Sequence, residues 1–256
     1  PPPPRPQIPT HQMSFHLRWD FQTRRSLRYH RRMRTLLGYL LLLGPLTATA
    51  ADAVPQLHHA QGEMAGEVTT TTVLLQSRLT AVPGPALDDD GDVPGTAGKA
   101  CFEWAIDADF AAARRTPLLI ATPERDFIVR TRLEGLTPAT TYHYRLVIDS
   151  DSGPPHVGPS RQFQTLPPPD SRVPLSFTMG SCQNYAFFMY GKDERSDPAP
   201  PSDRRLGFPT YAAMQRLAPA FFIGTGDIVY YDHPAKTRAK ILPELRRKWH
   251  EQFRFP

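Results

Sequence analysis

A carboxylate and a phenol lie three residues apart in the segment 224–232, which reads Gly-Thr-Gly-Asp-Ile-Val-Tyr-Tyr-Asp. The segment follows the apolar run 220–223, which we interpret as a short strand buried on both faces. Open α/β sheets bind ligands beyond the carboxyl ends of their strands, so Asp227 and Tyr230 would face one crevice. Hard oxygen donors at such a place suit a metal ion that binds phosphate. The alternative is that Asp227 caps a following helix and Tyr230 lies at its amphipathic rim.

A thiol follows a second predicted strand. Residues 173–179 alternate apolar and polar side chains, which predicts a strand, and they lead within a few residues to Cys182. The segment 210–218 is a plausible helix between the two strands, and a strand–helix–strand unit makes its strands parallel. Cys182 would then emerge at the same sheet edge as Asp227 and Tyr230. The sequence therefore predicts a metal site formed by these three side chains.

Two motifs around these residues resemble those of a known family. They are Ser-Cys-Gln at 181–183 and Phe-Phe-Ile-Gly-Thr-Gly-Asp-Ile-Val-Tyr-Tyr-Asp at 221–232, and they are similar to motifs of the alkaline phosphatase D (PhoD-like) metallophosphoesterases. The resemblance implies that Cys182 and Tyr230 bind a ferric ion and that Asp227 bridges iron to calcium. It also implies an exported hydrolase of phosphate mono- or diesters, and it marks no catalytic residue besides these metal ligands.

The resemblance also predicts what the chain should lack. The family's later motifs include an acid-rich segment that ends in Asp-Asp-His, and they should follow a stretch like 247–253. The chain stops at residue 256, so we expect residues 173–256 to form only the first βαβ part of a metallophosphoesterase sheet. We therefore expect a chain that is truncated within its catalytic domain. We also expect it to be inactive, because two-metal hydrolysis needs both ions fixed.

The first 53 residues have the pattern of a leader. A basic segment at 24–34 precedes a short apolar run and small residues, which predicts a secretory signal peptide with a true start at Met33. The apolar run is shorter than the roughly 20 residues that span a bilayer, so we expect no stable membrane span after cleavage. Arg31-Arg32 leaves a twin-arginine signal open, and a retained anchor is the other alternative. The predicted location is periplasmic, cell-surface or extracellular.

The leader accounts for the basic charge of the chain. The whole sequence carries 30 Lys and Arg against 25 Asp and Glu, which gives +5. Residues 1–34 hold eight Arg and one Asp, or +7, which leaves −2 for the remainder. Nucleic-acid binding would need a basic face on the folded part, and the sequence indicates none.

The middle of the chain is rich in β-branched residues, as strands are. The segments 68–76 and 127–133 are predicted strands. A Leu-Thr-Pro turn before Tyr142 is similar to the tyrosine corner of fibronectin type III domains, whose Tyr hydroxyl bonds back to the backbone. We therefore predict a fibronectin type III-like β-sandwich over residues 66–166. The proline-rich segment 167–172 is a predicted linker, so the fold class is β followed by α/β in separate domains.

Other residues leave alternatives open. Cys101 and Cys182 would form a disulfide if the exported chain used its two cysteines structurally. The acidic run 88–92 has some calcium-loop character, but it lacks the distal Glu, and a solvated hairpin tip is the preferred interpretation. We interpret His233 as a loop residue and His58-His59 as solvated spacer.

A second class of function also fits the sequence. The sandwich could be a secreted binding module, and the C-terminal part a vestigial hydrolase segment. The two intact motifs favour the hydrolase.

Overall fold

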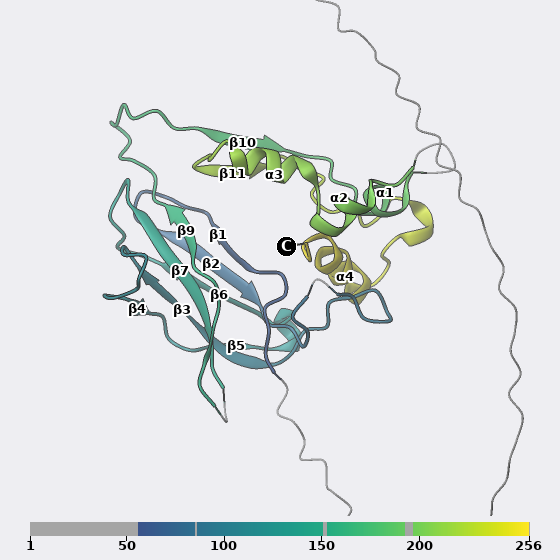
Figure 1. Cartoon of the computed structure of the whole chain (residues 1–256), viewed down its shortest axis with the longest axis horizontal. Coiled ribbons are helices and arrows are strands. Elements are labelled where there is room, and N and C mark those ends of the chain that lie inside the picture. The colour runs from purple at the N-terminus through teal and green to yellow at the C-terminus, as the bar shows by residue number, and fades with distance from the viewer. Residues whose placement is uncertain (1–55, 85, 151–152, 193–196, 256) are drawn as a thin grey trace, which may run out of the picture. The chain divides into compact units, whose positions relative to one another are not determined.

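The computed structural model describes most of the chain after the predicted leader (Figure 1). The described residues are 56–84, 86–150, 153–192 and 197–255. They belong to one compact unit. The predicted signal peptide and its start at Met33 lie outside them. Among the described residues no helix is both long and apolar enough to cross a membrane.

Two antiparallel sheets form the first part of the described chain (Figure 1). The first sheet has the order β1 (Glu63–Gly66), β2 (Val73–Arg78), β6 (Ile128–Leu133). The second has the order β4 (Arg114–Arg115), β3 (Gly98–Ala105), β7 (Thr141–Ile148), β8 (His156–Val157), with β5 (Leu119–Ala121) also paired to β3 and β9 (Arg161–Gln164) to β7. A 3₁₀ helix, η1 (Pro123–Arg125), precedes β6. The predicted β-rich first part is confirmed.

The core of this part is filled by side chains from both sheets. Strands alternate their side chains between two faces, so apolar residues two apart in sequence point to the same side. In β2 Val73 and Leu75 are fully buried, and in β3 Phe102 is fully buried. Leu146 and Ile148 of β7 complete the same cluster. Because all of these residues come from the two sheets, the sandwich has a core of its own.

Tyr142 has the predicted structural role. Its hydroxyl accepts a hydrogen bond of 2.9 Å from the backbone N–H of Thr137, five residues upstream. Its ring is buried and stacks on Phe163 with centroids 5.4 Å apart. The predicted tyrosine corner is therefore confirmed, and this Tyr is structural.

The first predicted strand, 68–76, is wrong at its start. The N–H of Thr69 bonds to the carbonyl of Thr72 at 2.9 Å, and the Thr69 hydroxyl accepts from the N–H of Thr71 and of Thr72. Threonine hydroxyls compete with strand pairing in this way, so the threonine run forms a turn and β2 begins only at Val73. The β-branched composition predicted a strand where side-chain hydrogen bonding makes a turn.

The interpretation of His58-His59 as solvated spacer is also wrong. The backbone of His58 forms a bridge with Thr80, with bonds of 2.9 and 2.8 Å. The His59 ring lies 2.6 Å from a carboxylate oxygen of Glu63, in β1. The ordered sandwich therefore begins before the predicted boundary at residue 66.

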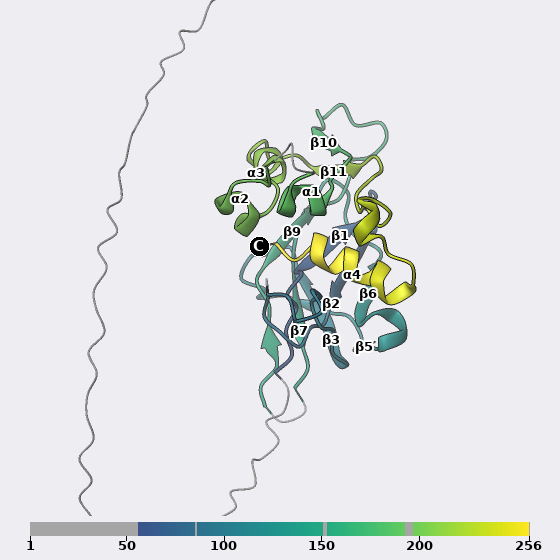
Figure 2. The same ribbon diagram turned by 90° about the vertical axis from the view of Figure 1, so that its right-hand side faces the viewer.

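The second part of the described chain contains two strands and several helices. The strands are β10 (Phe177–Gly180) and β11 (Phe221–Gly224); the helices are α1 (Tyr185–Tyr190), α2 (Pro201–Leu206), α3 (Pro209–Arg216), η2 (Ala235–Thr237) and α4 (Leu242–Gln252). The strands pair in parallel, with Phe177 opposite Phe221, and they run side by side in Figure 1 and Figure 2. The predicted parallel pairing is thus present. The predicted strand 173–179 is wrong in its first half, because pairing begins only at Phe177. The predicted helix at 210–218 is present as Pro209–Arg216, and it begins at a proline, whose missing N–H costs nothing at that position.

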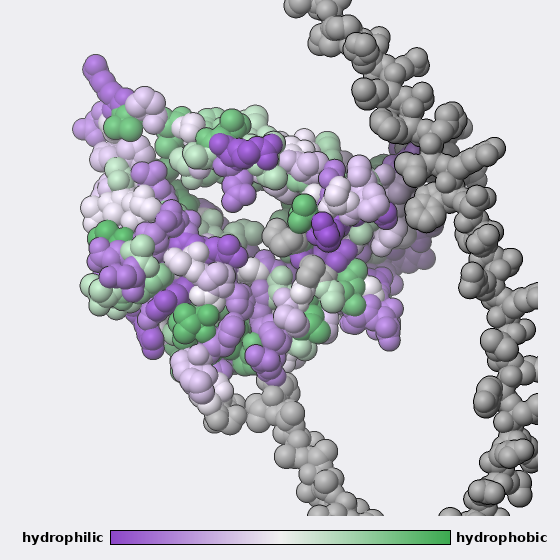
Figure 3. All heavy atoms as spheres, in the orientation of Figure 1, coloured by the Kyte–Doolittle hydropathy of each residue, from purple (hydrophilic) through white to green (hydrophobic). Residues whose placement is uncertain are grey.

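The predicted burial of 220–223 on both faces is wrong. Phe222 and Ile223 are each 38% exposed, and Met179 on the neighbouring strand is 56% exposed. In the described residues this sheet has only two strands. Helix α3 contacts it through Tyr211, whose ring lies 5.6 Å from that of Phe222. Figure 3 likewise shows hydrophobic side chains mixed with hydrophilic ones on the face of the described residues that it displays.

Candidate metal centre

Two loops continue the pairing of β10 and β11 beyond the ends of both strands. The N–H of Cys182 bonds to the carbonyl of Gly226 at 3.4 Å, and the N–H of Gln183 bonds to the carbonyl of Asp227 at 3.0 Å. Because the strands are parallel, both loops leave the sheet at the same edge. The backbone thus fixes the two predicted donor segments against each other.

Two of the three predicted metal ligands, Cys182 and Tyr230, contact the same carboxylate oxygen of the third, Asp227. The Cys182 thiol lies 3.6 Å from Oδ2 of Asp227, and the Tyr230 hydroxyl donates to the same Oδ2 at 3.0 Å. Cys182 and Asp227 are exposed and Tyr230 is half-buried, so the cluster is open to solvent. The predicted convergence of these side chains is therefore present, and their role as ligands stays a prediction.

Both loops hold non-glycine residues in a left-handed backbone conformation. The φ angle is +60° at Cys182 and +51° at Asp227. Such conformations cost on the order of 1–3 kcal/mol each and concentrate at functional sites. Here the two strained residues are the two whose side chains face each other. The adjacent Gly226 has a φ of +116°, which a residue with a Cβ rarely adopts.

The electrostatics of the cluster favour the protonated phenol when no cation is present. Hydrogen bonds with Cys182 and with Asp227 raise the pKa of the Tyr230 hydroxyl above its ordinary range. A bound cation would act in the opposite direction, since positive charge favours phenolate, thiolate and carboxylate together.

The donor set combines two hard oxygen donors with one soft sulfur donor. A thiolate, a carboxylate and a phenolate are three anionic donors, and hard oxygen donors suit cations such as ferric iron and calcium. No group of three or more His, Cys, Asp and Glu side chains able to hold a metal ion occurs among the described residues. Cys182 and Asp227 are only two residues of these four types, so with Tyr230 they form a smaller donor cluster, and metal binding by it stays a prediction.

The alternative interpretation of Asp227 as a helix cap is not supported. After β11 the chain forms bends, and the next helical segment is η2, whose N-cap is Pro234. Asp227 therefore caps no helix. The alternative Cys101–Cys182 disulfide is wrong as well, because both cysteines are free and Cys101 is buried in β3. Burial raises the pKa of the Cys101 thiol.

The acidic run 88–92 forms a turn, in agreement with the interpretation as a hairpin tip rather than a calcium loop. Oδ1 of Asp88 accepts from the N–H groups of Asp90 and Asp92, at 3.0 and 2.8 Å. The interpretation of His233 as a loop residue also holds, since it lies in a bend between β11 and η2.

Asn184 was missed by the sequence reasoning. Its side-chain oxygen accepts from the N–H of Phe187 at 3.0 Å, which caps α1, and its amide donates to the carbonyl of His233 at 3.3 Å. The residue therefore ties the Cys182 loop to the loop that carries Tyr230. An Asn directly before an apolar run is an N-cap signal, and that pattern could have identified it.

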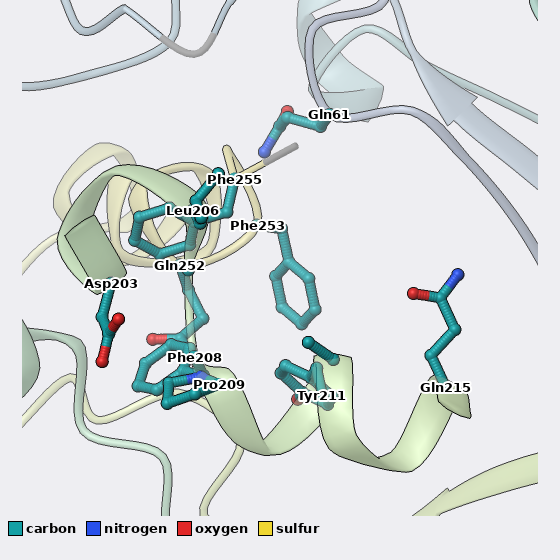
Figure 4. A pocket seen from close by; sticks show the side chains of 12 residues that line it. Gln61, Asp203, Leu206, Phe208, Pro209, Tyr211, Gln215, Gln252, Phe253 and Phe255 are labelled. Carbon is teal, nitrogen blue, oxygen red and sulfur yellow. The ribbon is translucent and has the colours of Figure 1, made fainter. Parts of the chain in front are cut away.

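A separate cavity of about 500 Å³ lies beside α3 and the end of α4 (Figure 4). Aromatic rings such as Phe208 and Phe253 line it together with the amides of Gln215 and Gln252. None of the three candidate ligands lines this cavity. The donor cluster is therefore a surface site distinct from it.

Comparison with known proteins supports the resemblance drawn from the sequence. Residues 46–167 match the family model described as the PhoD-like phosphatase, N-terminal domain. The match begins before the predicted domain start at residue 66. No protein of curated function matches the chain.

Among solved structures, that of PhoD is similar to this chain with a TM-score of 0.55 and 23% sequence identity. The match covers 77% of this chain and 35% of that one, so the chain spans about a third of the length of the PhoD structure. At this identity the likeness shows the fold alone. A fibronectin type III domain derived from a human protein has a TM-score of 0.31 at 19% identity, covering 44% of this chain and 77% of that one. A sensor domain of the anti-sigma factor RsgI4 from Pseudobacteroides cellulosolvens has a TM-score of 0.31 at 13% identity, covering 44% and 97%.

Proposed function

Because residues 46–167 match the N-terminal domain of the PhoD-like phosphatases, we propose that this chain is part of an exported, metal-dependent phosphoric ester hydrolase. One observation supports the hydrolase most directly. Cys182 and Tyr230 converge on the same oxygen of Asp227, just beyond two parallel strands. Ligands of open parallel sheets bind at this place.

Each of the three residues would have its own role in binding a pair of metal ions. Cys182 and Tyr230 would bind ferric iron, and Asp227 would contact iron and calcium together, because a carboxylate has two oxygens that accept. When bound, such a pair supplies Lewis-acid stabilisation of phosphoryl oxygens during in-line attack. The strained loops hold the donors in place beforehand, so little reorganisation is needed when cations bind.

The substrate class that fits this chemistry is phosphate mono- or diesters. Cys182 and Asp227 are exposed and Tyr230 is half-buried, so a phosphate group could approach the cluster from solvent. Export of the protein rests on the leader pattern in residues 1–53, which lie outside the described residues.

A secreted binding module is the second candidate. The observation that favours it is the sandwich's independent core. Such a module would bind its partner through the sandwich alone, and changes at Cys182 or Tyr230 would leave that binding unchanged.

Two measurements test the hydrolase. The coding sequence downstream of residue 256 is read first, and an acid-rich segment ending in Asp-Asp-His is expected there. The whole product is then assayed on nitrophenyl phosphate mono- and diesters with added iron and calcium. Metal-dependent turnover is the expected result.

The role of Tyr230 is tested by spectroscopy on the same protein. Phenolate and thiolate bound to ferric iron should give a visible charge-transfer band. Tyr230→Phe should weaken or shift this band, whereas Tyr231→Phe, at the exposed neighbouring position, should leave it unchanged. An unchanged band in the Tyr230 variant would show that this phenol is not a ligand.

A further inference from the structure

His250 of α4 is a buried histidine whose two ring nitrogens both meet carboxylates. The residue is only 4% exposed. Its Nδ1 lies 2.6 Å from an oxygen of Asp92, and its Nε2 lies 2.7 Å from an oxygen of Asp126. Asp92 ends the turn at 88–92, and Asp126 follows η1, so both partners belong to loops of the sandwich.

This geometry can be satisfied by only one protonation state of the ring. An ionised carboxylate only accepts hydrogen bonds, and a neutral imidazole has one N–H donor. The imidazolium has two, so it alone can donate to Asp92 and Asp126 together. We propose that His250 is a protonation-dependent latch that fastens helix α4 to the turn at 88–92 and to the end of η1.

The charges around the ring balance when it is protonated. Arg78 of β2 is also buried and lies 3.3 Å from Asp126, so His250 and Arg78 offset the two carboxylates. Loss of the ring proton removes one of the positive charges that face Asp92 and Asp126, two carboxylates that are largely withdrawn from solvent, and this is costly. It also turns a nitrogen lone pair toward a carboxylate oxygen at 2.6–2.7 Å.

Other charged groups belong to the elements that pack around the ring. They are Asp90 on the turn, Glu124 and Arg125 on η1, and Arg246, Arg247, Lys248 and Glu251 on α4. Arg246 donates to the carbonyls of Pro123 and Glu124, and Arg247 donates to that of Asp90. Arginine keeps its charge throughout the pH range in which a histidine titrates, so these contacts persist while His250 loses its proton.

The direction of the pH dependence follows from the contacts. Burial by itself would lower the pKa of His250, but the hydrogen bonds with Asp126 and Asp92 outweigh burial and raise the pKa above its ordinary 6.5. The stabilisation from this group is therefore complete below about pH 6.5 and is lost as the pH rises through the raised value.

The acid limit is set by Asp126. Burial would raise its pKa, but the bond with His250 and the charge of Arg78 lower it below its ordinary 3.8. The stabilisation from the Asp126 carboxylate is present above pH 3.8 and is lost as the pH falls through the lowered pKa of Asp126. The latch therefore holds between the lowered pKa of Asp126 and the raised pKa of His250, and it opens as the pH rises through the pKa of His250.

The latch joins the sandwich to the segment that carries the candidate metal centre. The residues after α4 contact α1: Arg254 donates to the Tyr185 hydroxyl at 3.2 Å, and the Phe255 ring lies 6.0 Å from that of Tyr185. Helix α1 begins three residues after Cys182. Helix α4 is thus tied to the sandwich at His250 and to α1 at its end.

The test is amide hydrogen exchange of the whole chain, followed in peptides covering 242–252 and corrected for intrinsic rates. In the unmodified chain, protection of α4 should fall as the pH rises past the His250 pKa, by about tenfold for each unit by which that pKa is raised. His250→Gln should give low protection that no longer changes with pH. His156→Gln, at an exposed histidine of β8, should behave like the unmodified chain.

A second variant keeps the proposal open to refutation if His250→Gln fails to fold. Asp92→Asn removes one carboxylate but leaves the Asp126 contact, so the His250 pKa, followed by nitrogen NMR of the ring, should fall. The protection step should move to lower pH with it. The latch would be overturned if α4 protection in either variant fell at the same pH as in the unmodified chain. It would also be overturned if the His250 ring of the unmodified chain titrated below pH 6.5.

Discussion

At the scale of single residues, the backbone at Cys182 and Asp227 shows how this chain orients its donors. Both have positive φ, and both donate or accept backbone hydrogen bonds across the two loops. The cross-loop hydrogen bonds hold the strained backbone in place, because a strained conformation persists only where its surroundings fix it. Sequence motifs indicated which side chains would meet, but they did not predict the left-handed backbone. Asp adopts positive φ more often than most residues do, whereas Cys at position 182 gives no such signal.

The sandwich depends at this scale on the hydroxyl of Tyr142. Tyr142→Phe should lower the free energy of unfolding by about 1–3 kcal/mol, because the N–H of Thr137 loses its partner beside a buried ring. Urea unfolding of the variant and the unmodified chain measures this difference. Tyr190→Phe is the control, since Tyr190 is 68% exposed. Equal losses in the two variants would contradict the role of the hydroxyl bond.

At the scale of elements, alternation at 173–179 and the continuous apolar run at 220–223 predicted the two strands, of which the first forms only from Phe177. The strand–helix–strand order predicted their parallel pairing and the donor cluster at one sheet edge. Composition was less reliable at the edges of the sandwich. The threonine run before Val73 looks like a strand by its β-branched side chains, but its hydroxyls form a turn. His58-His59 looks like spacer because it lies just past the predicted signal sequence, yet the backbone of His58 pairs with Thr80, 22 residues further along the chain. Pairing between distant segments leaves no local pattern to detect.

The first strand of the sandwich therefore matters for stability. A protein of residues 56–167 should be more stable to heat and urea than one of residues 66–167. The shorter form lacks nearly all of β1, the pairing of His58 and the packing of Leu57 against the core. Thermal unfolding followed by circular dichroism compares the two. Equal midpoints would show that β1 contributes nothing to the sandwich, and that the boundary at residue 66 is adequate.

At the scale of the whole molecule, the two parts differ in how well they bury their apolar residues. The sandwich has a large cluster of buried apolar residues, although Leu118 and Ile120 at its edge are exposed, whereas β10 and β11 leave Phe177, Met179, Phe222 and Ile223 partly exposed. Exposed apolar strands recruit other chains. The sandwich is thus the part expected to fold alone, and the two-stranded sheet is the part that depends on further contacts.

The described residues contain three candidate metal donors in one cluster, and this small number bears on whether they can catalyse hydrolysis. Residues 56–256 by themselves should release no more nitrophenol from phosphate mono- or diesters than residues 56–167 do, with iron and calcium present in both assays. Two-metal hydrolysis needs both ions fixed, and Cys182, Asp227 and Tyr230 form a single cluster of three donors in the described residues. Iron bound there should be weak and removed by a mild chelator, because few ligands leave the coordination of the ion incomplete. Metal-dependent turnover by residues 56–256, lost in Asp227→Asn and kept in Asp232→Asn, would show instead that this cluster suffices for catalysis.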